Sequence, residues 1–235
     1  MNEPPPDGVF FIHFLRLLLT AYEARNRTAE AIKKDPRSMP ADPLIAIVFS
    51  ALGTEAFINE LAEMAQRDAD MSEPDLRNTD TLRHLAAVLT AIDKKRPPEQ
   101  LQQKYLEASR ILSGQAFPRG SPAFQEFQAL IQLRDALVHP RHQDVTDQAG
   151  YISPRLCVVK NLQQRGLTRT RGSRRSSIPG GMSWLDELVT PDIANWAYQA
   201  AVGIVRAVGD ILPSGQAANL GIQFLKNRIT QLPAK

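Results

Sequence analysis

Residues 42–62 read DPLIAIVFSALGTEAFINELA, a long apolar stretch with the periodicity of an α-helix. Asp42 followed by Pro43 is a capping residue with a first-turn proline, which predicts that the helix starts there and continues to about Arg67. At 100° per residue, its apolar side chains cover nearly the whole circumference. A helix that is apolar on almost every side has to be buried, so we expect it to be the central helix of an all-α domain.

Helical periodicity also dominates most of the remaining chain, and prolines or capping residues mark several of the boundaries. The further predicted helices span about Val9–Lys34, Thr81–Lys94, Glu99–Leu112, Ser121–His139, Thr190–Leu212 and Gln216–Gln231. Long helices joined by short connections favour an up-and-down multi-helix bundle. We therefore expect residues 1–235 to form a single helical domain.

Residues 142–183 differ from the rest in composition, with glycines, serines and arginines and little helical periodicity. Between Arg155 and Trp184 lie seven basic residues and no carboxylate, whereas the rest of the chain has 21 basic and 25 acidic residues. The excess of positive charge therefore lies in one segment. We expect an exposed basic loop or hairpin inserted into the bundle, with Tyr151–Val159 as a short strand or hairpin arm.

The overall composition, 43% hydrophobic and 23% charged, excludes a disordered tail, a collagen-like rod and a membrane bundle. Val9–Leu19 is apolar, but acidic residues precede it and it is about half the length needed to span a bilayer, so we interpret it as a buried helix rather than a signal. The single cysteine, Cys157, cannot form an intramolecular disulfide. We expect a cytoplasmic protein that does not bind membranes.

Two helices carry charged or polar residues inside their apolar arcs. Glu55 and Asn59, four residues apart, project into the arc of the central helix, and a buried carboxylate needs a partner. Arg134 lies inside the apolar arc of the Ser121–His139 helix and needs an acid. Glu55 is the simplest partner for Arg134, and an ion pair between two core helices is one interpretation of both residues.

A second interpretation of Arg134 is chemical. His139 lies about 140° from Arg134 on a regular helix, but it precedes Pro140, which disfavours helical backbone and lets the ring swing toward the arginine. Asp135, four residues before His139, is placed to accept a hydrogen bond from the imidazole and to fix its tautomer. Such a histidine can move a proton while a guanidinium holds a phosphate.

The run Leu133-Arg134-Asp135-Ala136-Leu137-Val138-His139-Pro140 resembles the Arg-x4-6-His signature of HEPN domains, and residues 55–61 are similar to the second helix of many of them. The order of the predicted helices also fits this family. A second match to the signature, Arg77 to His84, straddles a predicted loop and helix start, and we discount it.

The resemblance implies a metal-independent ribonuclease of toxin or defence type that acts as a homodimer on RNA, with an antitoxin or defence-system protein as a possible partner. It assigns proton transfer to His139, stabilisation of the phosphorane to Arg134 and orientation of the histidine to Asp135. Glu55 and Asn59 would hold these groups in position. Because the nucleophile is the ribose 2′-hydroxyl, DNA should be inert.

The basic segment fits this activity as an RNA-binding arm, because clustered guanidinium groups bind a polyanion with little sequence preference. The candidate contacts are Arg165, Arg169, Arg171, Arg174 and Arg175. The alternative is a merely solvated loop, since it contains no aromatic residue between Tyr151 and Trp184 on which a base could stack. For the whole chain, the alternative is a non-catalytic HEPN-like module for protein interaction or regulation.

Other chemistries have little support in the sequence. There is no Gly-rich phosphate loop, nucleophile elbow, His-Glu-x-x-His pair or Cys-x-x-Cys pair, so we expect neither a metal nor a cofactor. We interpret His13 as a hydrogen-bonded core residue, Cys157 as a small apolar residue in a strand, and His142 as exposed. The aromatic residues are interpreted as core: Phe10, Phe11, Phe14, Trp184 and Trp196.

Overall fold

The computed structural model describes residues 13–71, 79–95, 99–139, 157–169, 184–213 and 220–233, and in these ranges all regular secondary structure is helical. This agrees with the expected all-α class and the helical bundle. The helices are α1 (His13–Lys34), α2 (Asp42–Met71), α3 (Thr79–Lys95), α4 (Gln100–Ser113), α5 (Pro122–Val138), α6 (Cys157–Gln164), α7 (Trp184–Glu187), α8 (Pro191–Ile211) and α9 (Leu220–Thr230).

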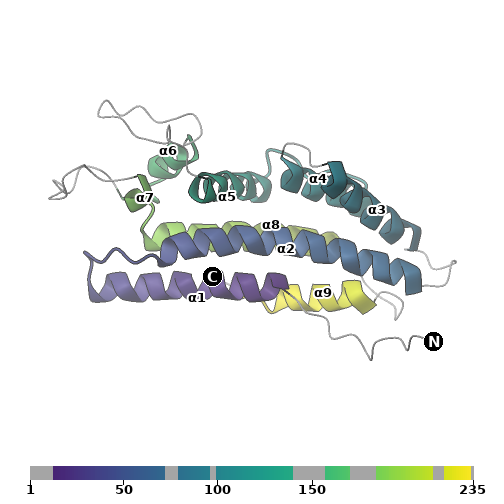
Figure 1. The fold of residues 1–235 in the computed structure, drawn as a ribbon, viewed down its shortest axis with the longest axis horizontal. Coiled ribbons are helices and arrows are strands. Elements are labelled where there is room, and N and C mark those ends of the chain that lie inside the picture. The colour runs from purple at the N-terminus through teal and green to yellow at the C-terminus, as the bar shows by residue number, and fades with distance from the viewer. Residues whose placement is uncertain are drawn as a thin grey trace.

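The helices are arranged around α2, as the apolar circumference of this helix predicts (Figure 1). In the view of Figure 1, α2 and α8 run through the middle, α1 and α9 lie end to end along one side, and α3, α4 and α5 lie along the other. The α1 and α2 backbones approach closely at Gly53, where a Cβ atom would lie 2.6 Å from Leu18 Cδ2. Any larger residue there would have to displace Leu18, so the glycine permits this packing.

Among the described helices, α2 alone is long and apolar enough to cross a membrane by length and composition. Within its most apolar window, 56% of the residues are buried inside the bundle. This burial is typical of the core helix of a bundle, and the length and composition by themselves are weak evidence for a membrane span.

Most helix boundaries follow the predicted signals. Pro122 and Pro191 each occupy the first turn of a helix, and the side chain of Thr190 caps α8 by accepting the N–H of Ile193 at 3.0 Å. α2 continues to Met71, beyond the predicted end near Arg67. Residues 9–12 and 216–219, where the first and last helices were predicted to begin, lie outside the described residues.

The prediction for the basic segment is wrong for Cys157–Gln164, which form α6 instead of a strand or a loop. Residues 165–169 are non-helical, and Arg165 and Gly166 are exposed, as expected for a loop. Val158, Val159 and Leu162 fall on one helical face and are buried in the core, and this apolar face explains why the segment folds as a helix. Residues 142–156 and 170–183 lie outside the described residues.

The expected core is confirmed for the aromatic side chains that the structure describes, because Phe14, Trp184 and Trp196 are buried. Phe10 and Phe11 lie outside the described residues. The interpretation of His13 as a core residue is wrong, because His13 is exposed at the first position of α1. Glu60 of α2 accepts the backbone N–H groups of His13 and Phe14, so this carboxylate caps the first turn of α1.

Candidate functional site

Arg134 of α5 and Glu55 of α2 form the ion pair that the sequence predicts, with 3.5 Å between Arg134 Nη2 and Glu55 Oε2. A second carboxylate also contacts the guanidinium, with 3.3 Å between Arg134 Nη1 and Asp135 Oδ1. The Arg134 side chain is 18% exposed, whereas Glu55 and Asp135 are 46% and 48% exposed. Glu55 is therefore not the buried carboxylate that we expected; it reaches from the edge of the α2 arc toward solvent.

The contacts of Arg134 are long for charge-assisted hydrogen bonds, which are typically about 2.7–2.9 Å. They involve Nη1 and Nη2, while the buried Nε has no hydrogen-bond partner among the described residues. A guanidinium has about five N–H donors. The two carboxylates therefore orient the Arg134 side chain without using all of its donors.

His139 lies at the C-terminal end of the same helix and is exposed. Its backbone angles, φ −122° and ψ 63°, are not helical, as expected for a residue before proline. Its N–H still bonds to the Asp135 carbonyl oxygen at 3.1 Å, so the helix continues up to the nitrogen of this residue. The expected bond between the imidazole and the Asp135 carboxylate stays a prediction.

Asn59, expected beside Arg134, takes part in a different polar cluster. Its side-chain oxygen accepts a 2.6 Å hydrogen bond from Lys104 Nζ of α4, and Lys104 also contacts Asp93 of α3 at 2.5 Å. The Lys104 side chain is only 4% exposed. The structure thus separates the two residues that the sequence placed together: Glu55 contacts Arg134, while Asn59 helps to join α2, α3 and α4.

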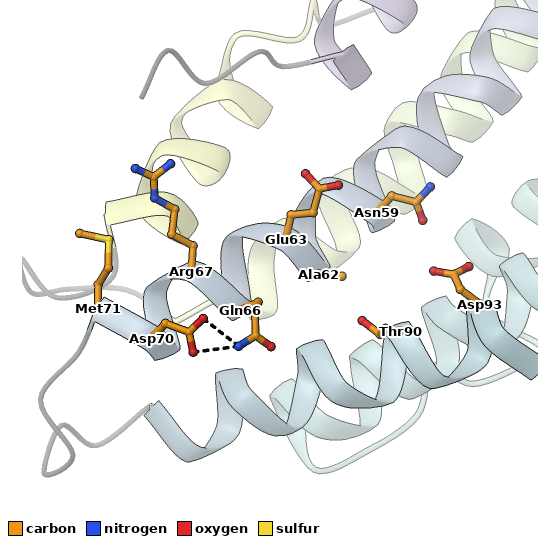
Figure 2. A pocket seen from close by; sticks show the side chains of 9 residues that line it. All are labelled: Asn59, Ala62, Glu63, Gln66, Arg67, Asp70, Met71, Thr90 and Asp93. Atoms are coloured by element: carbon orange, nitrogen blue, oxygen red, sulfur yellow. Dashed lines mark hydrogen bonds between the residues drawn. The ribbon is translucent and has the colours of Figure 1, made fainter. Parts of the chain in front are cut away.

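A groove lies next to this cluster, between the C-terminal half of α2 and α3 (Figure 2). We call it the α2/α3 groove; its volume is about 750 Å³, and Asn59, Gln66, Asp70 and Asp93 are among the residues that line it. Two of its polar groups are bound to each other, since the Gln66 amide donates to both oxygens of Asp70 at 2.8 and 3.0 Å, as the dashed lines show.

A second groove, the α5/α6 groove, has a volume of about 420 Å³. Four of its lining residues are amides, three on α5 and one on α6: Gln125, Gln128, Gln132 and Asn161. An ion pair between Glu126 and Arg165, with 3.0 Å between Glu126 Oε2 and Arg165 Nη1, also lies there. Cys157 lines the groove and is exposed.

Two of the predicted RNA-binding arginines have partners within the chain. Arg165 pairs with Glu126, and Arg169 donates to the Ser38 carbonyl oxygen at 2.8 Å and contacts the sulfur of Met39. These contacts hold the α6 region against α5 and against the connection between α1 and α2. Arg171, Arg174 and Arg175 lie outside the described residues.

Neither the family models, the curated proteins nor the solved structures include a match to this chain. The residues themselves therefore carry the functional argument. Within the described ranges, no group of three or more His, Cys, Asp or Glu side chains is placed to hold a metal ion.

Sequence reasoning missed four buried charged residues: Glu60, Asp68, Lys104 and Glu187. Lys104 lies in the apolar arc of α4, and Glu60 and Asp68 lie on the buried side of α2. Glu55 and Arg134 were identified because each is a charged or polar residue in an apolar helical arc. The same criterion, applied to every helix, would also have identified Lys104 and Glu60.

Glu60 and Asp68 cap other helices from a distance. Glu60 Oε1 accepts the N–H groups of His13 and Phe14 at 2.7 and 3.0 Å, and the Asp68 carboxylate accepts those of Gly221 and Ile222, both at 2.9 Å. These bonds satisfy N–H groups at the first turns of α1 and α9. Burial raises the pKa of Glu60 above its ordinary value of 4.5, although the hydrogen bonds from Phe14 and His13 oppose the shift.

Proposed function

We propose that this chain is a HEPN-like, metal-independent endoribonuclease that cleaves RNA through the ribose 2′-hydroxyl. The proposal rests on the surroundings of Arg134. Two half-exposed carboxylates orient its guanidinium and leave some of its N–H donors unused. Arg134 also lies on the helix that ends at the exposed His139. A phosphate can bind such a guanidinium without the side chain first having to be ordered.

In this mechanism, His139 takes the proton from the 2′-hydroxyl or gives one to the leaving 5′-oxygen, and the product carries a cyclic phosphate. Arg134 stabilises the charge on the phosphorane. Glu55 and Asp135 act by positioning Arg134, because both carboxylates contact its guanidinium. Asn59 has no such role in the proposal, since its contact is with Lys104.

A dimer completes the site. On a regular helix, Arg134 and His139 point in directions about 140° apart, so a twofold arrangement can place His139 of one copy beside Arg134 of the other. The same proposal places the protein in the cytoplasm, with an antitoxin or defence-system protein as the regulator of a toxic activity.

The second candidate function is a non-catalytic helical module for protein interaction or regulation. It is favoured by the low exposure of Arg134 and by the two carboxylates already in contact with it, because an ion pair between α2 and α5 needs no ligand. The two functions differ in the role of the exposed His139, which transfers a proton in the nuclease and has no chemical role in the non-catalytic module.

RNA cleavage in EDTA by wild type and by His139→Ala distinguishes them. We expect wild type to cut structured RNA to cyclic-phosphate ends and to leave DNA of the same sequence intact, and His139→Ala to lose at least about 100-fold in rate. His84→Ala, which removes an exposed histidine from α3, is the matched control and should retain full activity. Equal cleavage by wild type and His139→Ala, or none by either on varied RNAs, contradicts the nuclease and favours the non-catalytic module.

A further inference from the structure

The amides of the α5/α6 groove face solvent, since Gln125, Gln132 and Asn161 are exposed and Gln128 is partly buried. The side chains of Gln125, Gln128, Gln132 and Asn161 form no hydrogen bond with any other described residue. Each amide offers two donors and an acceptor with two lone pairs. Four such groups around one groove of about 420 Å³ make a surface that can both donate and accept hydrogen bonds.

Two of the groove amides on α5 are also in helical register with His139. Gln125, Gln132 and His139 follow one another at intervals of seven residues, so around a helix neighbours in this series lie about 20° apart and the two outer residues about 40° apart. The helical hydrogen bond from the His139 N–H to Asp135 extends this register to the helix end. The same side of α5 therefore carries these amides and, about 10 Å beyond Gln132 along the axis, the backbone of His139, whose φ of −122° is not helical.

The charged residues of the groove indicate which class of ligand it can bind. Its one carboxylate, Glu126, is already paired with Arg165, and the lining contains no other acidic group. Arg165 is 38% exposed and uses Nη1 in this pair, so part of its planar guanidinium faces solvent. Neutral amides beside an exposed guanidinium suit a ligand with hydrogen-bonding edges and a stackable face, which is the chemistry of an unpaired nucleobase.

We propose that the α5/α6 groove binds unpaired bases of a single-stranded RNA segment and leads its backbone to His139. The inference rests on the proposed nuclease function for its substrate class. The groove amides hydrogen-bond the base edges, and Arg165 stacks on a base or contacts the adjoining phosphate. A volume of about 420 Å³ is within the range of small-ligand clefts, roughly 300–1,000 Å³. Duplex RNA, whose base edges are paired, does not fit this groove.

Cys157 provides a direct test of binding, because it is the only cysteine of the chain, lines the groove and is exposed. The experiment measures the rate at which a small maleimide alkylates Cys157 in full-length His139→Ala, in which the RNA stays intact. We expect a single-stranded RNA 12-mer of mixed sequence to slow alkylation at least about fivefold, and a duplex of the same strands to leave the rate unchanged. Cys157→Ser confirms that the label is on this residue.

A pair of substitutions tests the amides themselves. Gln125→Ala with Gln132→Ala should weaken the protection of Cys157 at least about fivefold and, in the otherwise wild-type enzyme, raise KM for RNA with little change in kcat. Gln103→Ala, at an exposed amide of α4, should change neither quantity. Circular dichroism of each variant checks that the helices are intact.

The outcomes separate this inference from the proposed function. If wild type cleaves RNA in a His139-dependent way but single-stranded RNA leaves Cys157 alkylation unchanged, the nuclease stands and the groove proposal is wrong. If Cys157 is protected by single-stranded RNA and no RNA is cleaved, the groove binds RNA and the nuclease proposal is wrong. Equal protection by duplex RNA, or by an unrelated peptide, overturns the assignment to unpaired bases.

Discussion

Two cations of the bundle interior, Lys104 and Arg134, are held in very different ways. Lys104 is almost fully buried and lies 2.5 Å from Asp93 and 2.6 Å from Asn59. Arg134 is more exposed, and its contacts with Glu55 and Asp135 are 3.5 and 3.3 Å long. Both cations bridge helices around α2, yet only the contacts of Lys104 are short enough for strong charge-assisted hydrogen bonds.

This difference indicates different roles for the two clusters. The ammonium of Lys104 is enclosed by groups from α2 and α3, so it joins three helices and has little access to a ligand. Arg134 keeps unused donors beside two carboxylates that solvent can reach. The Lys104 cluster is therefore interpreted as structural, and the Arg134 cluster as the candidate site. The stability predictions for Lys104 and Arg134 test this distinction, and those for Asp68 and Glu60 test two other buried charges.

The largest loss of stability is expected for Lys104→Met, which keeps the volume of the side chain and removes its charge. Asn59 and Asp93 lose their shared donor, and because Asp93 is half exposed the loss should be about 2–3 kcal/mol, below the 3–5 kcal/mol typical of fully buried pairs. Urea unfolding followed by circular dichroism measures it. Lys94→Met, at an exposed position of α3, is the matched control and should change stability by less than about 0.5 kcal/mol. A loss as small as that of the control would mean that Lys104 is not structural.

The next largest effect is expected for Asp68→Ala, which removes the cap of α9. The N–H groups of Gly221 and Ile222 lose their acceptor in a buried position, at a cost of about 1–2 kcal/mol. Amide hydrogen exchange should speed up first in α9, because the cap belongs to that helix. Asp70→Ala removes an exposed carboxylate two residues away and should leave the exchange of α9 unchanged; equal effects of the two variants would contradict the capping role.

The sequence predicts the fold best where a pattern is local. The apolar circumference of α2 indicated a central helix, and the prolines at positions 43, 122 and 191 marked three helix starts. α6 was missed because its apolar face consists of only three buried residues in a segment dominated by glycine, serine and arginine. A helix of eight residues gives a weak periodic signal, and its packing against α5 supplies what the local pattern lacks.

The contacts of the candidate site could likewise be predicted only where a local sequence pattern indicates them. The pairing of Arg134 with Glu55 could be predicted because each was a charged residue in an apolar arc and the two charges were opposite. The partner of Asn59 could not, because an amide accepts hydrogen bonds from many donors and Lys104 comes from a helix that the sequence does not place beside it. The caps made by Glu60 and Asp68 likewise depend on which helix ends meet α2 in space.

A smaller effect on stability is expected for Arg134→Met. Its partners are half exposed and can be solvated once the guanidinium is gone, so the loss should be about 1 kcal/mol or less. Urea unfolding at low and high salt measures it, and the difference from wild type should shrink as salt is raised. A loss equal to that of Lys104→Met would make Arg134 a structural residue of the same kind and would favour the non-catalytic function over the nuclease.

The smallest effect is a pH dependence that comes from Glu60. Burial raises the pKa of this carboxyl in the folded chain above its ordinary value of 4.5, so the folded state binds more protons than the unfolded state between those two pKa values. Stability contributed by this group is therefore fully present below pH 4.5 and is lost as the pH rises through the raised pKa.

Glu60→Gln keeps an oxygen that can accept the N–H groups of His13 and Phe14 but cannot titrate, so the free energy of unfolding should fall less steeply with rising pH in the variant than in wild type. Unfolding of both proteins in urea between pH 4.5 and 7 measures the two slopes. Parallel slopes would mean that Glu60 titrates at the same pH in the folded and unfolded chains, and that this buried carboxylate is stabilised by its environment as well as water stabilises it.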